Sequence, residues 1–140
     1  VNETQKEPVP YYMPCYGGTY PYHLISVPDS HTLNSIFLER EDLIESRGSA
    51  SLMLHPEDGA ELGIKDGDRI IAWNDLAEVE FKALFTDQIA RKTAAASGVY
   101  SSAITGQRLQ VNALNHERLS DIGEATTLND NTIDIKRSTF

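Results

Sequence analysis

The sequence predicts one mainly β domain with short helices, folded as a closed or partly closed barrel. The chain of 140 residues is long enough for a single hydrophobic core and too short for a multidomain enzyme. Its apolar residues come in short runs of strand length. These runs do not alternate with long helical patterns, so a doubly wound parallel sheet is not indicated.

Four apolar runs predict strands, at residues 23–27, 51–54, 69–73 and 79–85. The last run is the best candidate for a strand with one buried face, because it alternates between two sets of residues. The set expected to be buried is Val79, Phe81, Ala83 and Phe85, and the other is Glu80, Lys82 and Leu84. Two later segments, TAAAS at 93–97 and TIDIK at 132–136, predict weaker strands.

One helix is predicted over residues 56–62, ending at Gly63. Pro56 suits its first position, and His55 stands where a capping residue is expected. The acidic Glu57 and Asp58 suit its positive N-terminus, and we expect Ala60 and Leu62 to face inward.

A turn is predicted between this helix and the strand at 69–73. Asp66, Gly67 and Asp68 are turn residues, and Gly67 is expected to take a positive φ.

The charge balance argues against nucleic acid as a partner. Twelve Lys and Arg against twenty-one Asp and Glu give a net charge of −9, which repels a phosphate backbone. No apolar run approaches the roughly 20 residues of a membrane span. Cys15 is the single cysteine, so no internal disulfide is possible. This is compatible with the cytoplasm, although the localisation stays open.

Common catalytic motifs are missing from the sequence, including phosphate-binding loops, GxGxxG, GxSxG, HExxH and paired CxxC. The four histidines, His23, His31, His55 and His116, are far apart and are predicted to serve in surface, capping or packing positions. We therefore predict no metal ligand among them.

Two polar segments remain, at residues 28–35 and 111–130. Their Ser, Thr, Asn and Asp side chains could hydrogen-bond a heterocycle and its phosphates without the help of many Lys or Arg side chains. The same residue types are usual in turns, where they bond their own backbone. From the residues alone both interpretations stay open.

The order of five sequence blocks resembles a known family. The blocks are HLISVPDSHTLNSIF, LHPEDGAELGIKDGDRI, FTDQI, GVY, and VNALNHERLSD with TLND. They resemble the C-terminal molybdopterin dinucleotide-binding domain of the dimethyl sulfoxide reductase and formate dehydrogenase type oxidoreductases. The resemblance runs from about Tyr20 to Arg137 and implies a double-psi β-barrel, with the second block as scaffold.

The resemblance implies that ligand contacts come from the two polar segments. The expected cofactor-binding residues are Ser30, His31, Asn34, Ser35, Asn112, Asp121, Thr127 and Asn129. Amide side chains and Asp121 could bond the guanine or pterin edge, and the hydroxyl groups could approach the pyrophosphate or the pterin.

The sequence departs from the family pattern at two places. Glu124 and Ala125 stand where the family commonly has glycines, which reduces backbone freedom there. A carboxylate at Glu124 is also unfavourable beside a pyrophosphate. Tyr100 replaces a frequent Trp.

The function that the resemblance implies is cofactor binding without a catalytic centre. The parent enzyme would use molybdenum or tungsten held by two pterin guanine dinucleotides, and this domain would cover one dinucleotide beside the preceding domains of the same chain. Residues 1–19 are expected to form a linker or arm, 20–137 the barrel, and 138–140 a tail. Cys15 is interpreted as a free thiol rather than a metal ligand, and the isolated domain is predicted to be inactive.

Two alternatives belong to other classes. A double-psi barrel also occurs as a protein-interaction module without a cofactor, and fold alone does not decide between the two functions. A stand-alone hydrolase or decarboxylase ranks last, because the sequence offers neither an activated nucleophile nor a paired carboxylate motif.

Overall fold

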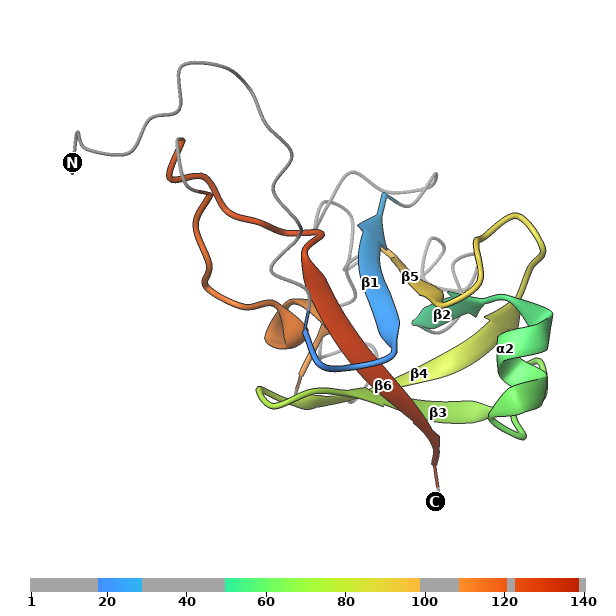
Figure 1. Cartoon of the computed structure of the whole chain (residues 1–140). Helices are drawn as coiled ribbons and strands as arrows, with labels where there is room; N and C mark the ends of the chain where they lie inside the picture. The colour runs from blue at the N-terminus through green and yellow to red at the C-terminus, as the bar shows by residue number, and fades with distance from the viewer. Residues whose placement is uncertain (1–17, 29–49, 99–108, 121–122, 139–140) are drawn as a thin grey trace, which may run out of the picture.

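Six strands close into a barrel in the order β1-β5-β2-β4-β3-β6. The computed structural model describes residues 18–28, 50–98, 109–120 and 123–138. The strands are β1 (Tyr22–Val27), β2 (Ser51–Leu54), β3 (Arg69–Trp73), β4 (Glu78–Phe85), β5 (Thr93–Ser97) and β6 (Asn131–Arg137). Helix α2 (Pro56–Glu61) and the 3-10 helix η2 (Val111–Leu114) lie on opposite sides of the barrel (Figure 1). The predicted mainly β barrel with short helices is confirmed.

The barrel combines parallel and antiparallel neighbours. β1 runs parallel to β5, and β2 runs parallel to β4, whereas the other four pairs are antiparallel. β6 closes the barrel because it pairs with β1 on one side and β3 on the other. The double-psi crossing that the resemblance implies stays a prediction.

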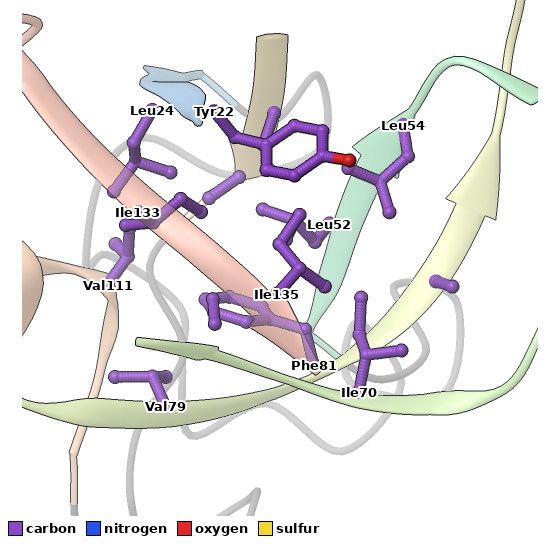
Figure 2. Close-up of a cluster of buried hydrophobic side chains, with 14 of the residues drawn as sticks. Tyr22, Leu24, Leu52, Leu54, Ile70, Val79, Phe81, Val111, Ile133 and Ile135 are labelled. Atoms are coloured by element: carbon purple, nitrogen blue, oxygen red, sulfur yellow. The ribbon is translucent and has the colours of Figure 1, made fainter. Parts of the chain in front are cut away.

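The core is made by the inward side chains of all six strands (Figure 2). Alternation in β4 buries Val79, Phe81 and Ala83, as its sequence pattern predicts. The other strands contribute Tyr22, Leu24, Leu52, Leu54, Ile70, Ala72, Ala94, Ala96, Ile133 and Ile135. Burial of this continuous apolar cluster is the main favourable term in folding.

β5, one of the two weaker predicted strands, lies between two partners. Its three alanines have little strand propensity, but all three are buried, and β5 pairs with both β1 and β2. Pairing on both sides therefore outweighs the residue preference. All six predicted strands are present, with bounds within one residue of those expected.

The helix and turn predictions are confirmed in their main points. The backbone N–H of Glu57 donates to His55 Nδ1 at 3.2 Å, so His55 caps α2. Gly67 has a φ of +83° and donates its N–H to the carbonyl oxygen of Ala83 at 2.9 Å. The positive φ explains the glycine at this turn.

The inward face of α2 differs from the expected one. Leu62 packs against the core as expected, but Ala60 is exposed, and Asp58 and Gly59 are buried instead. A Cβ on Gly59 would stand 2.0 Å from Cζ of Phe85, so the missing side chain makes room for this ring. The prediction for Ala60 is therefore wrong, because close approach to Phe85 selects the glycine face.

The described residues just before β1 also contact the barrel. The ring of Tyr20 packs edge-on against Trp73 with 5.3 Å between centroids. The limits of the arm, the barrel and the tail stay predictions. No helix in the described ranges is long and apolar enough to cross a membrane.

Candidate functional site

The end of β1, where the first polar segment begins, and the residues just before β6, which belong to the second, lie at one end of the barrel, which we call the loop end. β1 and β5 are parallel and finish together, because Val27 is the partner of Ser97 and Gly98 N–H donates to the Val27 carbonyl at 2.9 Å. β6 is antiparallel to β1 and begins with Asn131 opposite Leu24, so the residues that precede β6 lie toward the end of β1. The segment that follows β1 and the one that precedes β6 therefore leave the barrel side by side.

Residues 109–130 form a folded segment, described except at 121 and 122. It starts with η2, whose Val111 and Leu114 are buried. It then doubles back on itself, because Leu119 and Thr126 form an antiparallel bridge. Ser120 N–H donates to the Ala125 carbonyl at 2.8 Å within this reversal. The segment therefore has two limbs joined by backbone hydrogen bonds.

Three of the eight predicted binding residues lie in the described part of this segment. Asn112 is exposed on η2, and Asn129 is exposed just before β6. The hydroxyl of Thr127 donates to the carbonyl of Arg118 at 3.1 Å, so it also ties the two limbs together. The remaining five, Ser30, His31, Asn34, Ser35 and Asp121, lie outside the described residues.

Asn129 links the second polar segment to the start of the first. Its Oδ1 accepts a hydrogen bond from the backbone N–H of Ser26 at 3.4 Å, near the end of β1. Residues 28–35 begin two positions after Ser26 along the chain. The structure therefore brings Asn129 next to the origin of the other predicted binding loop.

Two buried asparagines that the sequence analysis did not single out hold this segment on the barrel. Asn131, at the start of β6, is 1% exposed, and Asn74, just after β3, is 6% exposed. Asn131 accepts from His116 N–H and donates to the Leu128 carbonyl, both at 2.9 Å. Asn74 Nδ2 donates to the carbonyl of Leu114 at 2.8 Å. The sequence did offer one signal for them, because each asparagine stands at one end of an apolar run that predicts a strand.

Glu124 takes the backbone conformation that glycine favours. Its φ is +48°, in the left-handed region, and its N–H donates to the Ser120 carbonyl at 3.2 Å. Glu124 is exposed, so its carboxylate lies toward solvent. Glu124 therefore places a side chain in a backbone conformation that favours glycine.

Two of the histidines, His55 and His116, have contacts that support the fold. His55 caps α2, and His116 Nε2 lies 3.4 Å from Asp75 Oδ1, which connects the 109–130 segment to the turn between β3 and β4. Within the described ranges no three His, Cys, Asp or Glu side chains gather as a metal site. The absence of metal ligands in the whole chain stays a prediction.

An ionic cluster lies at the opposite end of the barrel, between α2 and the connection from β4 to β5. Buried Asp58 accepts hydrogen bonds at 2.7 Å from Arg91 Nε and from the backbone N–H of Lys92. Arg91 also pairs with Glu57 and Glu61. Burial raises the pKa of Asp58, but these hydrogen bonds and cationic charges outweigh it and leave the pKa below its usual value. This cluster fastens α2 and is spatially separate from the loop end.

Comparison with known proteins decides the family. The family model described as "Molydopterin dinucleotide binding domain" matches residues 22–132. The chain belongs to this family. The match covers the barrel from β1 into β6 and includes both polar segments of this molybdopterin dinucleotide-binding domain.

Curated relatives of the domain are much longer proteins. It is 28% identical over 118 residues to "Probable oxidoreductase YoaE" of Bacillus subtilis, covering 84% of this chain and 17% of the relative. It is 40% identical over 79 residues to "Respiratory nitrate reductase subunit alpha" of Haloferax mediterranei, covering 56% and 8%. The domain therefore spans less than a fifth of the length of these relatives.

A solved structure supports the fold. Acetylene hydratase from Pelobacter acetylenicus aligns with a TM-score of 0.70 at 15% sequence identity, over 94% of this chain and 21% of that chain. At this identity the likeness concerns the fold alone.

Proposed function

We propose that this molybdopterin dinucleotide-binding domain holds one molybdopterin guanine dinucleotide in a larger molybdenum- or tungsten-dependent oxidoreductase. The observation that carries the proposal is the contact of Asn129 with Ser26, which places the second polar segment beside the end of β1, where the first polar segment begins. The family match supports a cofactor of the molybdopterin type. The names of the relatives support an oxidoreductase as the parent.

We propose that the described side chains bond the edge of a neutral heterocycle. The exposed amides of Asn112 and Asn129 each offer a donor and an acceptor, which match the mixed ring N–H and carbonyl groups of guanine or pterin. The hydroxyl group of Thr127 donates to the backbone carbonyl of Arg118, and its oxygen keeps lone pairs that can accept a hydrogen bond from a ligand N–H. Ser30, His31, Asn34, Ser35 and Asp121 complete the proposed set. These groups would orient the dinucleotide without a strong positive field.

We assign binding and orientation to this domain, and catalysis to other parts of the parent enzyme. When bound, the cofactor supplies redox chemistry at its metal, and the protein supplies position and electrostatics. The short span of the domain relative to its relatives supports this division, since it covers 17% of one and 8% of another. We expect no turnover by the isolated chain.

A nucleotide titration tests the proposal. Guanosine diphosphate, which carries the guanine and pyrophosphate groups, is added to the ¹⁵N-labelled 140-residue chain and the amide shifts are followed. We expect shifts at residues 28–35 and 111–130, and weak affinity because a single domain leaves much of the ligand in water. The titration therefore extends to millimolar nucleotide.

A matched pair of variants makes the titration specific. Asn129→Ala removes one amide and should weaken binding about fivefold, the effect of roughly 1 kcal/mol for one hydrogen bond. Gln88→Ala removes an exposed amide from the connection between β4 and β5, so nucleotide binding should be unchanged. Shifts confined to other surfaces would contradict the cofactor proposal and favour a protein-interaction module.

A further inference from the structure

We infer that Asn74 and Asn131 are positioning residues that set the shape of the cofactor-binding segment without touching the ligand. This inference rests on the proposed function and concerns the same site. Both side chains are buried, with exposed fractions of 6% and 1%. A buried amide is costly unless its donors and acceptors are bonded, and here the bonds go largely to the 109–130 segment.

Asn131 joins the two limbs of that segment. Its Oδ1 accepts from the backbone N–H of His116 at 2.9 Å on the first limb. Its Nδ2 donates to the carbonyl of Leu128 at 2.9 Å on the second limb, and to Asn115 Oδ1 at 3.2 Å. Because Asn131 belongs to β6, both limbs are held relative to a strand of the barrel.

Asn74 fixes the beginning of the same segment. Its Oδ1 accepts from the backbone N–H groups of Leu76 and Ala77, at 2.9 and 3.3 Å, and so organises the turn between β3 and β4. Its Nδ2 donates to the carbonyl of Leu114 at the end of η2. The contact between His116 and Asp75 makes a second link between this turn and the segment.

The fixed backbone positions lie close to the proposed ligand residues. Asn112 precedes Leu114 by two residues, and Thr127 and Asn129 are the immediate neighbours of Leu128. Side chains that contact one rigid heterocycle need fixed positions relative to one another. A buried residue that is hydrogen-bonded to the backbone beside them can hold these positions before the ligand binds. The two asparagines therefore preorganise the proposed site.

Substitution by aspartate, which has nearly the same shape, tests the NH2 donor of each amide separately from its oxygen acceptor. Asn74→Asp keeps an oxygen for the turn amides of Leu76 and Ala77, but replaces the donor to the Leu114 carbonyl with a repelling oxygen. Asn131→Asp keeps the acceptor for His116 N–H and loses the donor to Leu128. Neither change removes a group that we place on the ligand.

Thr132→Val provides a matched control on the same strand. Thr132 is buried beside Asn131, and its Oγ1 lacks a hydrogen-bond partner within the described residues. Valine has nearly the same shape and removes only this unbonded hydroxyl. Thr132→Val should therefore leave the 109–130 segment and its nucleotide binding unchanged.

The experiment measures amide hydrogen exchange and guanosine diphosphate binding on each variant of the 140-residue chain. We expect faster exchange at Ser120 and Thr127, and binding weakened about tenfold, for both Asp variants, while the amides of β2 and β4 keep their protection. Asn74→Asp retains its turn bonds, so it decides the question even if Asn131→Asp does not fold.

The two proposals fail in different ways. Unchanged exchange and unchanged binding in a folded Asn74→Asp variant would overturn the positioning role. Loss of protection in β2 and β4 together with the segment would also overturn it, because the amide would then support the whole fold. Absence of any nucleotide-induced shift in the wild type would instead count against the proposed function.

Discussion

Glu124 holds a left-handed backbone conformation with a side chain that disfavours it. Its φ of +48° lies where a non-glycine residue costs on the order of 1 kcal/mol. We predict that Glu124→Gly raises the free energy of unfolding by about 0.5–1 kcal/mol, measured by urea denaturation, because glycine relieves the Cβ strain. Removing the carboxylate should also strengthen guanosine diphosphate binding.

Glu117→Gly is the control for this change. Glu117 is another exposed residue of the same segment, and it is not among the described residues with positive φ. Glycine there adds unfolded-state entropy without relieving strain, so stability should stay equal or fall. An equal gain from both variants would refute strain at Glu124 as the cause.

The sequence predicted only some of the residues that shape the candidate site, and the reason is physical. Asn112, Thr127 and Asn129 were named because they match a family pattern, and their roles as ligand residues stay predictions. Asn74 and Asn131 were missed because their importance depends on which carbonyl groups the fold brings within 3 Å, and hydrophobic periodicity carries no such information.

At the scale of elements, α2 is held to the barrel by charge as well as by packing. Asp58 is buried and bonded to Arg91 and Lys92, and its pKa lies below the usual value. A lowered folded-state pKa means that the stabilisation is present above the unfolded pKa of about 3.9 and is lost as pH falls through the folded value. Stability should therefore decline in acid.

We predict that Asp58→Asn lowers the free energy of unfolding at neutral pH by about 2 kcal/mol, because it removes charge-assisted hydrogen bonds. The difference from the wild type should shrink below about pH 4, because the carboxylate of the unfolded wild type gains its proton there, while that of the folded protein does so only at lower pH. Urea denaturation across this range measures both effects. Asp87→Asn, at an exposed position after β4, should change neither quantity. A constant difference at all pH values would contradict the assignment.

The elements themselves were well predicted because each has a local signal. The run in β4 alternates, and His55, Pro56 and Gly63 mark the limits of α2. The inward face of α2 was not predictable from local signals, because Gly59 is buried through its contact with Phe85, a residue far along the chain. Closure into a barrel could be predicted from the length and spacing of the strands. The sequence did not predict which strands pair with β5, namely β1 and β2.

At the scale of the whole molecule, salt dependence distinguishes a nucleotide site made of uncharged groups from one that binds phosphate through cationic side chains. The chain carries a net charge of −9, and Glu117 and Glu124 are exposed in the 109–130 segment. We predict that guanosine diphosphate affinity is constant or rises as salt increases from about 20 to about 200 mM, because salt screens repulsion. Uncharged guanosine is the control and should show little dependence. A steep fall with salt would indicate a cationic phosphate site instead.

The place of β6 in the barrel has a consequence for the time course of folding. β6 is the last strand along the chain, yet it lies between β1 and β3 and makes the closing contacts with both. During synthesis the earlier strands must wait with two unpaired edges until residue 137 has emerged, and contacts between such distant segments form slowly. Asn131 arrives with this same strand, so its side chain can join the two limbs of the 109–130 segment only when the barrel closes.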